Sequence, residues 1–236
     1  MTENSQVSAP CLLAFDAAGR SCSAAVFRDG EVLAEAFEPM SRGQAERLVP
    51  MIEEVLATAG LRHGALDALA VTVGPGAFTG VRIGLAAARG YGLALGIPQI
   101  GVTCLEAVAG ATEQAERRGR RLLVLLDAKR ADLYAQFFDE ALTPLGEPFT
   151  ATPGELAARL AGDGGPPLLL AGDGVEQAFQ ALEDLDPRRS KAVGLHASAV
   201  ARAAAAKPWP DKRARLPGPL YLRPPDDTHP HAAPAG

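Results

Sequence analysis

The chain repeats one strand pattern at a fixed spacing, and this repeat constrains its fold more than any other feature. The apolar segment 12–17 ends a strand with an aspartate and leads into a second apolar run; segment 123–128 does the same 111 positions later. Segment 168–174 then resembles segment 70–76, because both run from apolar residues into Gly-x-Gly. Either match alone is compatible with chance similarity between apolar strands. Their shared order predicts a duplicated unit of strand–strand–strand–helix–strand–helix.

The first half of the chain carries the patterns of one such unit. Apolar runs predict strands at residues 11–15, 21–27, 32–37 and 69–73. Apolar residues at helical spacing predict an amphipathic helix that contains Pro50 and stops at Gly60; the proline should kink the helix or lie in its first turns. A second helix is expected over residues 81–95, with Thr79 as its N-cap.

The second half carries the same kinds of pattern, followed by a proline-rich tail. The expected strands are 99–102, 122–126, 142–149 and 168–171, and the expected helices are 105–118, 153–160, 175–185 and 197–206. From residue 207 onward lie 8 of the 19 prolines, which favours an extended tail. The expected organisation is a disordered leader (1–10), an N-terminal domain (11–104), a C-terminal domain (105–206) and the tail (207–236), disordered from 224.

Composition argues against several classes of function. The 47% apolar content is ordinary for a globular protein, and a net charge of −5 argues against holding nucleic acid by electrostatics alone. Cys11, Cys22 and Cys104 form no CxxC pair, so neither a disulfide framework nor a zinc site is indicated. The first ten residues do not resemble a signal peptide, and no apolar run could span a bilayer. We therefore expect a cytoplasmic protein without membrane contact.

The glycine turn at residues 74–76 lies between a predicted strand and a predicted helix. Backbone N–H groups at such a helix N-terminus point the same way, so Gly74, Gly76 and Thr79 are candidates for binding an anion such as phosphate. The turn is not a P-loop, because no Gly-Lys-Ser/Thr follows the glycines.

The helix after this turn carries a row of small residues. Gly80, Gly84, Ala88 and Gly92 follow one another at i, i+4 spacing. A helical glycine costs about 1 kcal/mol relative to alanine, so the row needs a packing reason. The row could pack on the helix's own sheet or meet another protein. Because the helix is apolar nearly all round, it needs cover on more than one side, which favours a partner surface.

Several motifs together resemble the TsaB (YeaZ) family. The most specific is Gly-Pro-Gly-Ala-Phe-Thr-Gly-Val-Arg-Ile-Gly at residues 74–84. Others lie at 13–16, 46–52, 101–105, 126–130 and 219–223. The resemblance covers residues 11–138 well and then only scattered positions up to 223. The chain departs from the family at Gln44, where many members carry a histidine.

The resemblance implies an α/β fold of the actin-like ATPase class (ASKHA, RNase H-like) with two similar domains. It also implies a non-catalytic subunit that pairs with the catalytic subunit TsaD, and with the ATPase TsaE, to form N6-threonylcarbamoyladenosine on tRNAs that read codons starting with A. Pairing would use the two helices of the first half, the same surface would form a homodimer when the chain is alone, and tRNA would be reached only through the complex. The implied interface residues are Gly80, Arg82, Gly84, Ala88, Gly92, Leu48, Met51 and Ile52.

In actin-like ATPases, aspartates at the positions of Asp16 and Asp127 face the nucleotide phosphates and their metal. A working site also needs phosphate-binding groups and a polar residue that orients water, but alanines follow both aspartates here. We therefore interpret these residues as a vestigial nucleotide site with no catalytic residue and no cofactor, weak nucleotide binding at the partner interface being left open. Its members are Asp16, Gly74, Gly76, Thr79 and Asp127.

No metal site is expected. TsaD-like enzymes hold their metal with a histidine pair on one helix face, whereas the four histidines here form no pair at i, i+4. No Gly-x-Ser-x-Gly elbow is present, and nothing supports a glycopeptidase. The basic runs 117–121 and 212–215 are interpreted as solvated helix ends or linkers rather than tRNA contacts.

Two other functions stay open at this point. One is an ATP-dependent kinase-like or hydrolase enzyme of the same fold. The other is a homodimer with an unrelated binding role. Hydrolysis of ATP that depends on Asp16 would favour the enzyme.

Overall fold

The computed structural model describes residues 9–212, 214 and 217–223. The expected leader therefore lies almost wholly outside the described residues, as does the part of the tail from residue 224. Within the described chain, no helix is both long and apolar enough to cross a membrane.

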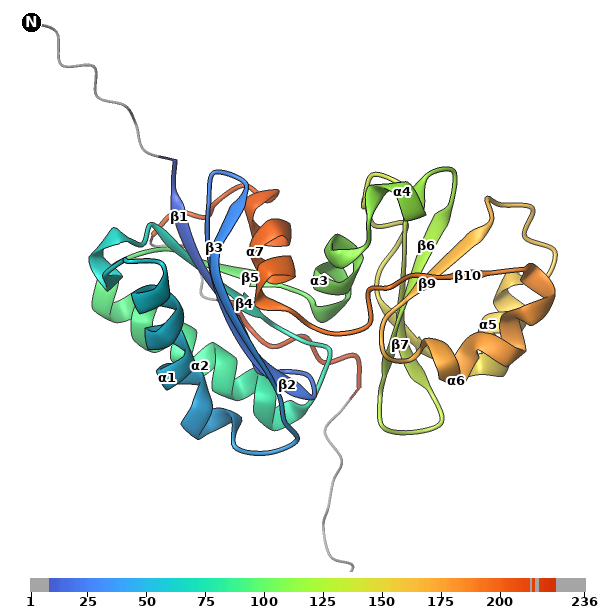
Figure 1. Ribbon diagram of the computed structural model, residues 1–236. Helices are drawn as coiled ribbons and strands as arrows, with labels where there is room; N and C mark the ends of the chain where they lie inside the picture. Colours follow the sequence, from blue (N-terminus) through green and yellow to red (C-terminus); the bar gives the residue numbers. More distant parts are fainter. Residues whose placement is uncertain (1–8, 213, 215–216, 224–236) are drawn as a thin grey trace, which may run out of the picture.

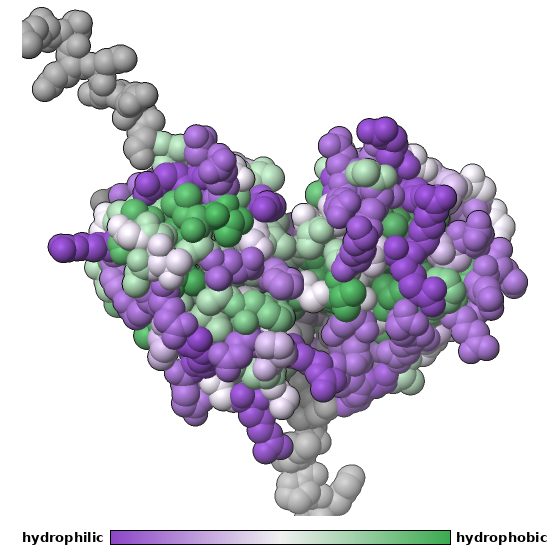
Figure 2. All heavy atoms as spheres, viewed as in Figure 1, coloured by the Kyte–Doolittle hydropathy of each residue, from purple (hydrophilic) through white to green (hydrophobic). Residues whose placement is uncertain are grey.

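Two five-stranded sheets form the centres of two lobes (Figure 1). Space-filling spheres in Figure 2 show a notch between the two lobes at the top of the view and continuous contact below it. The first lobe begins with β1 (Cys11–Asp16), β2 (Ser21–Arg28), β3 (Glu31–Pro39), α1 (Gln44–Thr58), η1 (His63–Ala65), β4 (Ala68–Thr72), α2 (Phe78–Leu95) and β5 (Gln99–Val102). The chain continues through α3 (Cys104–Ala111), α4 (Gln114–Arg117), β6 (Arg121–Asp127), β7 (Leu133–Phe138), β8 (Phe149–Ala151), α5 (Pro153–Leu160), β9 (Leu168–Ala171), α6 (Val175–Phe179), η2 (Gln180–Leu185), β10 (Arg188–Arg189) and α7 (Ala197–Ala205).

The two sheets have the same topology. The first has the strand order β3-β2-β1-β4-β5, and the second has the order β8-β7-β6-β9-β10. In each sheet the central strand pairs antiparallel with the strand that follows it and parallel with the fourth strand of its unit. The duplicated unit predicted from the sequence is confirmed.

The repeat extends to the backbone of the turns. Asp16 ends β1 as Asp127 ends β6. Gly74 follows β4 with φ +102°, and Gly172 follows β9 with φ +106°. Glycine adopts such angles without a steric penalty, so both Gly-x-Gly turns can redirect the chain into a helix.

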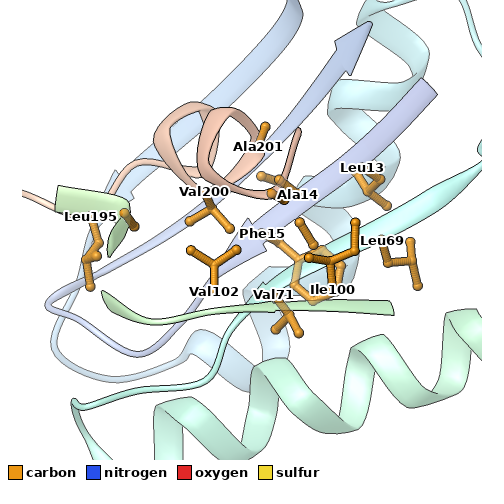
Figure 3. Packing of buried hydrophobic residues seen from close by; sticks show 14 of the residues in the cluster. Leu13, Ala14, Phe15, Leu69, Val71, Ile100, Val102, Leu195, Val200 and Ala201 are labelled. Atoms are coloured by element: carbon orange, nitrogen blue, oxygen red, sulfur yellow. The ribbon is translucent and has the colours of Figure 1, made fainter. Parts of the chain in front are cut away.

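Helix α7 packs on the first sheet although it follows the second sheet in the chain. Helices α1 and α2 cover one face of the first sheet, and α7 covers the other (Figure 1). Figure 3 shows Val200 and Ala201 of α7 close to Ala14 of β1 and Val102 of β5. The helix is mostly alanine, so its backbone can approach the strands closely. The expected second domain, 105–206, includes this helix, whereas the structure joins it to the first lobe.

The expected helix at 105–118 is interrupted. Helix α3 ends at Ala111, and Thr112 is extended, with its hydroxyl donating to the carbonyl oxygen of Ala109 at 2.6 Å. Glu113 and Glu116 then form a capping box that starts α4. A continuous helical pattern therefore contained a local stop signal that periodicity alone did not reveal.

Two other expected elements differ from the prediction. The expected strand 142–149 is irregular up to residue 148: Leu142 has φ +68°, and an isolated bridge joins Pro144 to Phe138. The strand that pairs with β7 is β8, which begins only at Phe149. The expected helix 175–185 is α-helical to Phe179 and continues as the 3₁₀ helix η2.

Candidate functional site in the cleft between the lobes

A cleft of about 860 Å³ lies between the two lobes. Its walls are the β1–β2 loop, the N-terminus of α1, the β4–α2 turn, the β6–β7 loop and the C-terminal segment that contains Tyr221 and Arg223. Of the vestigial-site candidates, Gly76, Thr79 and Asp127 line this cleft. The structure thus brings the two repeated strand ends to one place.

Asp16 lies beneath the cleft wall and has no solvent exposure. Its Oδ1 accepts hydrogen bonds from the backbone N–H of Ala18 at 3.0 Å and from the hydroxyl of Thr72 at 2.5 Å. Its Oδ2 is buried and has no hydrogen-bond partner within the described residues. Burial raises the pKa of Asp16 from 3.8 to about 6, because a charged carboxylate is poorly solvated there. The lining of the cleft therefore does not include this carboxyl group.

One side of the glycine turn lies against the β1–β2 loop. The backbone N–H of Ala77 donates to the carbonyl oxygen of Ala18 at 2.8 Å. A methyl group at Gly76 would lie 2.7 Å from that same oxygen, and one at Gly80 would lie 2.0 Å from the carbonyl oxygen of Ala17. The glycines therefore allow the β1–β2 loop to lie directly on the turn. The N–H of the N-cap residue Ala77 is thus bound to a peptide carbonyl, whereas the next two residues, Phe78 and Thr79, are exposed in the cleft wall.

The N-cap of α2 is Ala77, so the prediction of Thr79 at this position is wrong. No side chain accepts a hydrogen bond at this cap. The Ala18 carbonyl accepts from the N-cap N–H instead, which a sequence pattern cannot reveal because the two residues are far apart in the chain. Thr79 is exposed in the cleft wall.

Asp127 carries its own counter-ion. Its Oδ1 accepts from the backbone N–H of Lys129 at 2.7 Å, and its Oδ2 lies 2.5 Å from the Lys129 ammonium. These contacts hold the pKa of Asp127 below its usual range. The backbone N–H of Asp127 donates to Asp173 at 2.9 Å, so the second lobe supplies two further carboxylate oxygens nearby. The Lys129 ammonium therefore already neutralises this carboxylate.

These residues do not fit a metal-bound nucleotide of the kind that actin-like ATPases hold. One aspartate is buried, the other is paired with a lysine, and peptide carbonyls lie against the glycine turn. Among the described residues, no group of three or more His, Cys, Asp or Glu side chains could hold a metal ion.

The row of small residues on α2 faces its own sheet. Gly80, Gly84, Ala88 and Gly92 are all buried. A methyl group at Gly84 would lie 3.2 Å from Val71 of β4, and one at Gly92 would lie 2.1 Å from the side chain of Gln99 of β5. This geometry corrects the expectation that the row docks a partner: it serves close packing of the helix on the sheet.

The expected interface residues of α1 are also in the core. Leu48, Met51 and Ile52 are buried beneath the helix. Of the eight residues implied for the interface, only Arg82 is exposed. It lies near the start of α2.

The outward faces of α1 and α2 carry other apolar side chains. Leu93 of α2 is 87% exposed and Val49 of α1 is 46% exposed. The two helices are joined by a hydrogen bond from the Tyr91 hydroxyl to Glu53 at 3.1 Å. The sequence analysis did not predict these exposed residues. Leu93 could have been found, because it directly follows Gly92 and so lies on the helix face next to the glycine row.

The basic run at residues 117–121 is used within the chain. Arg117 donates to the carbonyl oxygen of Glu140 at 3.0 Å, and Arg120 donates to that of Leu168 at 3.3 Å. Arg121 forms an ion pair with Asp163 at 2.7 Å. These internal contacts speak against a tRNA-binding patch. The other basic run, 212–215, lies partly outside the described residues.

The duplicated unit, the shared sheet order and the cleft between the lobes define a protein of the actin-like ATPase fold. A hexokinase of the ROK type from Thermus thermophilus has the same fold, with a TM-score of 0.50 and 16% identity over 83% of this chain and 97% of that one. YeaZ from Pseudomonas aeruginosa is more similar: its TM-score is 0.72, with 28% identity over 90% of this chain and all of that one.

Sequence relatives give the family. The model of the family TsaD, tRNA N6-adenosine threonylcarbamoyltransferase, matches residues 32–207. An uncharacterized protein of Mycobacterium tuberculosis is 38% identical over 94% of this chain and 96% of its own length. The tRNA threonylcarbamoyladenosine biosynthesis protein TsaB of Escherichia coli is 38% identical over 52% of each chain. The chain belongs to the TsaD family that this model describes and, within it, to the TsaB/YeaZ group.

Proposed function

We propose that this chain is a non-catalytic subunit that supports a TsaD-like catalytic subunit in forming N6-threonylcarbamoyladenosine on tRNA. The role is transferred from the E. coli relative, whose name places it in tRNA threonylcarbamoyladenosine biosynthesis. A TsaE-like ATPase is the proposed third member of the complex. The tRNA is bound through the complex, in keeping with the chain's net charge of −5.

The pairing of Lys129 with Asp127 carries the non-catalytic part of this proposal. An actin-like ATPase needs its strand-end carboxylates free to meet a metal and the nucleotide phosphates. Here the ammonium of Lys129 pairs with the Asp127 carboxylate, and the Asp16 carboxylate is fully buried. The kinase-like or hydrolase alternative would require both groups to be released.

The partner surface in this proposal is the outward face of α1 and α2. Leu93 and Val49 give this face exposed apolar area, and Arg82 lies at its end near the start of α2. Exposed apolar side chains on adjoining helices favour the association of helices from another subunit. The same face would form a homodimer when the catalytic subunit is absent.

Threonylcarbamoyl transfer to tRNA tests the proposal directly. The TsaD-like and TsaE-like proteins of the same organism are assayed with and without this chain, and modified nucleoside is measured by mass spectrometry. We expect product only when the chain is present. Full activity of the other two proteins without the chain would contradict a supporting role.

A second assay separates the scaffold from the enzyme. The chain alone is tested for ATP hydrolysis, with the Asp127→Asn variant beside it. We expect no hydrolysis above background from either protein, and undiminished transfer activity when the Asp127→Asn variant is used in the complex. Turnover by the chain alone that disappears in the variant would establish the enzymatic alternative.

A further inference from the structure

Strand β3 is the longest sheet edge in the described part of the chain. It has nine residues, whereas the other edge strands, β5, β8 and β10, have four, three and two. The chain itself covers β5: the Lys207 ammonium donates to the carbonyl oxygen of Gly101 at 3.1 Å, and a methyl group at Gly101 would lie 3.0 Å from Pro217. Within the described residues, β3 makes backbone hydrogen bonds only to β2, so the N–H and C=O groups on its outer side are free for a further strand.

The sequence of β3 does little to block such pairing. Sheet edges are commonly protected by lysine, by proline or by short length, but residues 31–38 contain neither lysine nor proline. Leu33 and Phe37 lie on one face of the strand and are 39% and 40% exposed. The Phe37 ring stacks on His196 just before α7, with the ring centroids 4.3 Å apart, so this face is the one that α7 covers further in. The edge therefore combines open backbone groups with exposed apolar side chains.

Antiparallel pairing with a second copy would match these side chains. Across a two-fold axis, residue i faces residue j of the second copy and j faces i, so Leu33 of each copy can face Phe37 of the other. Cross-strand apolar pairs of this kind stabilise a sheet. In this register Glu35 lies at the axis and faces its own counterpart. Its Oε1 accepts from the Ser198 N–H at 3.0 Å and lies 3.7 Å from Nδ1 of His196, so its charge is directed toward the start of α7.

The two ends of β3 carry opposite charges that are not paired within the chain. Asp29 and Glu31 lie at its beginning and Arg42 follows its end; all three are exposed and form no ion pair with a described residue. Glu38, in contrast, is bound to Arg47 at 2.7 Å. Antiparallel pairing places the beginning of one strand beside the end of the other, so the acidic end of each copy meets Arg42 of the other. A parallel pair would bring like charges together.

We propose that β3 pairs antiparallel with β3 of a second copy of this chain and joins their two first sheets into one continuous sheet. In Figure 1 this strand forms the margin of the first sheet, whereas α1 and α2 lie on one of its faces. The contact is therefore separate from the α1 and α2 surface and does not rest on the proposed role in tRNA modification. It leaves that surface of each copy available to another partner.

Sedimentation equilibrium of the full chain tests the pairing. The Leu93→Glu variant is the reference, because its charge removes association through α1 and α2. We expect this reference to form dimers as its concentration rises. Leu33→Lys in the same background should weaken the dimer by about tenfold or more, because a lysine would replace the leucine that faces Phe37. Leu145→Lys places the same charge on an exposed leucine of the second lobe and should leave the dimer unchanged.

A charge swap tests the orientation of the strands. Glu31→Arg should weaken the dimer, because it brings two arginines together, and the further substitution Arg42→Glu should restore it. Amide hydrogen exchange locates the contact: the amides of β3, and not those of α2, should exchange more slowly as concentration rises.

The outcomes separate this contact from the proposed function. A monomeric Leu93→Glu reference, a dimer that survives Leu33→Lys or is lost in Leu145→Lys, a swap that does not restore it, or protection confined to other segments would each overturn the strand pairing. None of these results depends on whether the chain supports threonylcarbamoyl transfer, which the tRNA assay measures by itself.

Discussion

The ammonium of Lys129 lies 2.5 Å from Oδ2 of Asp127 at the end of β6. In the first lobe the equivalent aspartate, Asp16, is instead completely buried. The two halves of the duplication have therefore lost a free carboxylate by different physical routes, one by pairing and the other by burial. Each route predicts its own response to mutation.

Removing the ammonium should release Asp127. In the Lys129→Ala variant we expect the pKa of Asp127 to rise toward its ordinary value, measured by carboxyl NMR titration. Because the folded-state pKa is held low in the parent, the pair stabilises the protein above the unfolded-state pKa and loses this effect as pH falls below it. Both side chains are partly exposed, so the free energy of unfolding at pH 7 should fall by less than about 1 kcal/mol. The distant substitution Lys191→Ala should leave the pKa of Asp127 unchanged.

Burial of Asp16 should make stability depend on pH in the opposite sense. Its pKa is raised from 3.8 to about 6, so the folded protein binds this proton more tightly than the unfolded chain. The contribution of Asp16 to the free energy of unfolding is therefore largest below pH 3.8 and falls until the pH passes about 6.

The isosteric Asp16→Asn variant should lack this dependence. Relative to the parent, its free energy of unfolding should improve by roughly 3 kcal/mol between acidic pH and pH 8. Urea unfolding of both proteins across this range measures the difference, in which the other titrating groups cancel. Parallel curves would mean that Asp16 titrates normally.

Two glycines of the same helix should respond in opposite ways to a methyl group. Gly80→Ala would force the new methyl onto the Ala17 carbonyl, so we expect the free energy of unfolding to fall by about 1–3 kcal/mol. Gly90 is also in α2 but has open space at that position, and Gly90→Ala should stabilise the protein by roughly 1 kcal/mol. Chemical denaturation of both variants distinguishes packing from helix propensity; equal effects would contradict the close approach of the β1–β2 loop.

The exposed face of α1 and α2 can be tested with a single charge. Leu93→Glu should abolish co-purification with the TsaD-like subunit without changing thermal stability, because the side chain is 87% exposed in the free chain. Leu145→Glu places the same charge on an exposed leucine of the second lobe and should leave the complex intact. Binding that survives Leu93→Glu would mean that the partner uses another surface.

Much of the fold could be predicted because the patterns are local. Continuous apolar runs gave the central strands of both sheets, and the matching order of turns indicated the duplication. Thr112 and Leu142 show where this fails: a single extended or left-handed residue ended an element inside an apparently suitable pattern. Such stops depend on a few hydrogen bonds that periodicity does not record.

The residues of the site could be predicted from the sequence, but the contacts that they make could not. Asp16 and Asp127 could be recognised as equivalent from their places in the repeat, and alanines after both suggested a weak site. That Lys129 would fold back on Asp127 depends on a left-handed backbone at the lysine, φ +60°, which few non-glycine residues adopt. The row of glycines could be recognised in the sequence, but its packing partner could not. Small residues at this spacing suit either a partner helix or the chain's own sheet. In the structure Val71 and Gln99 lie opposite the row, so it packs on the sheet.

The position of α7 has a consequence for how the protein is made. The first sheet is complete in sequence at Val102, yet one of its faces is covered by a helix that ends at Ala205. A ribosome builds the chain from the N-terminus, so the nascent first lobe must wait with that apolar face open while the whole second lobe is synthesised. The first lobe can therefore finish folding only after α7 has been synthesised, because this helix covers the open face of the first sheet.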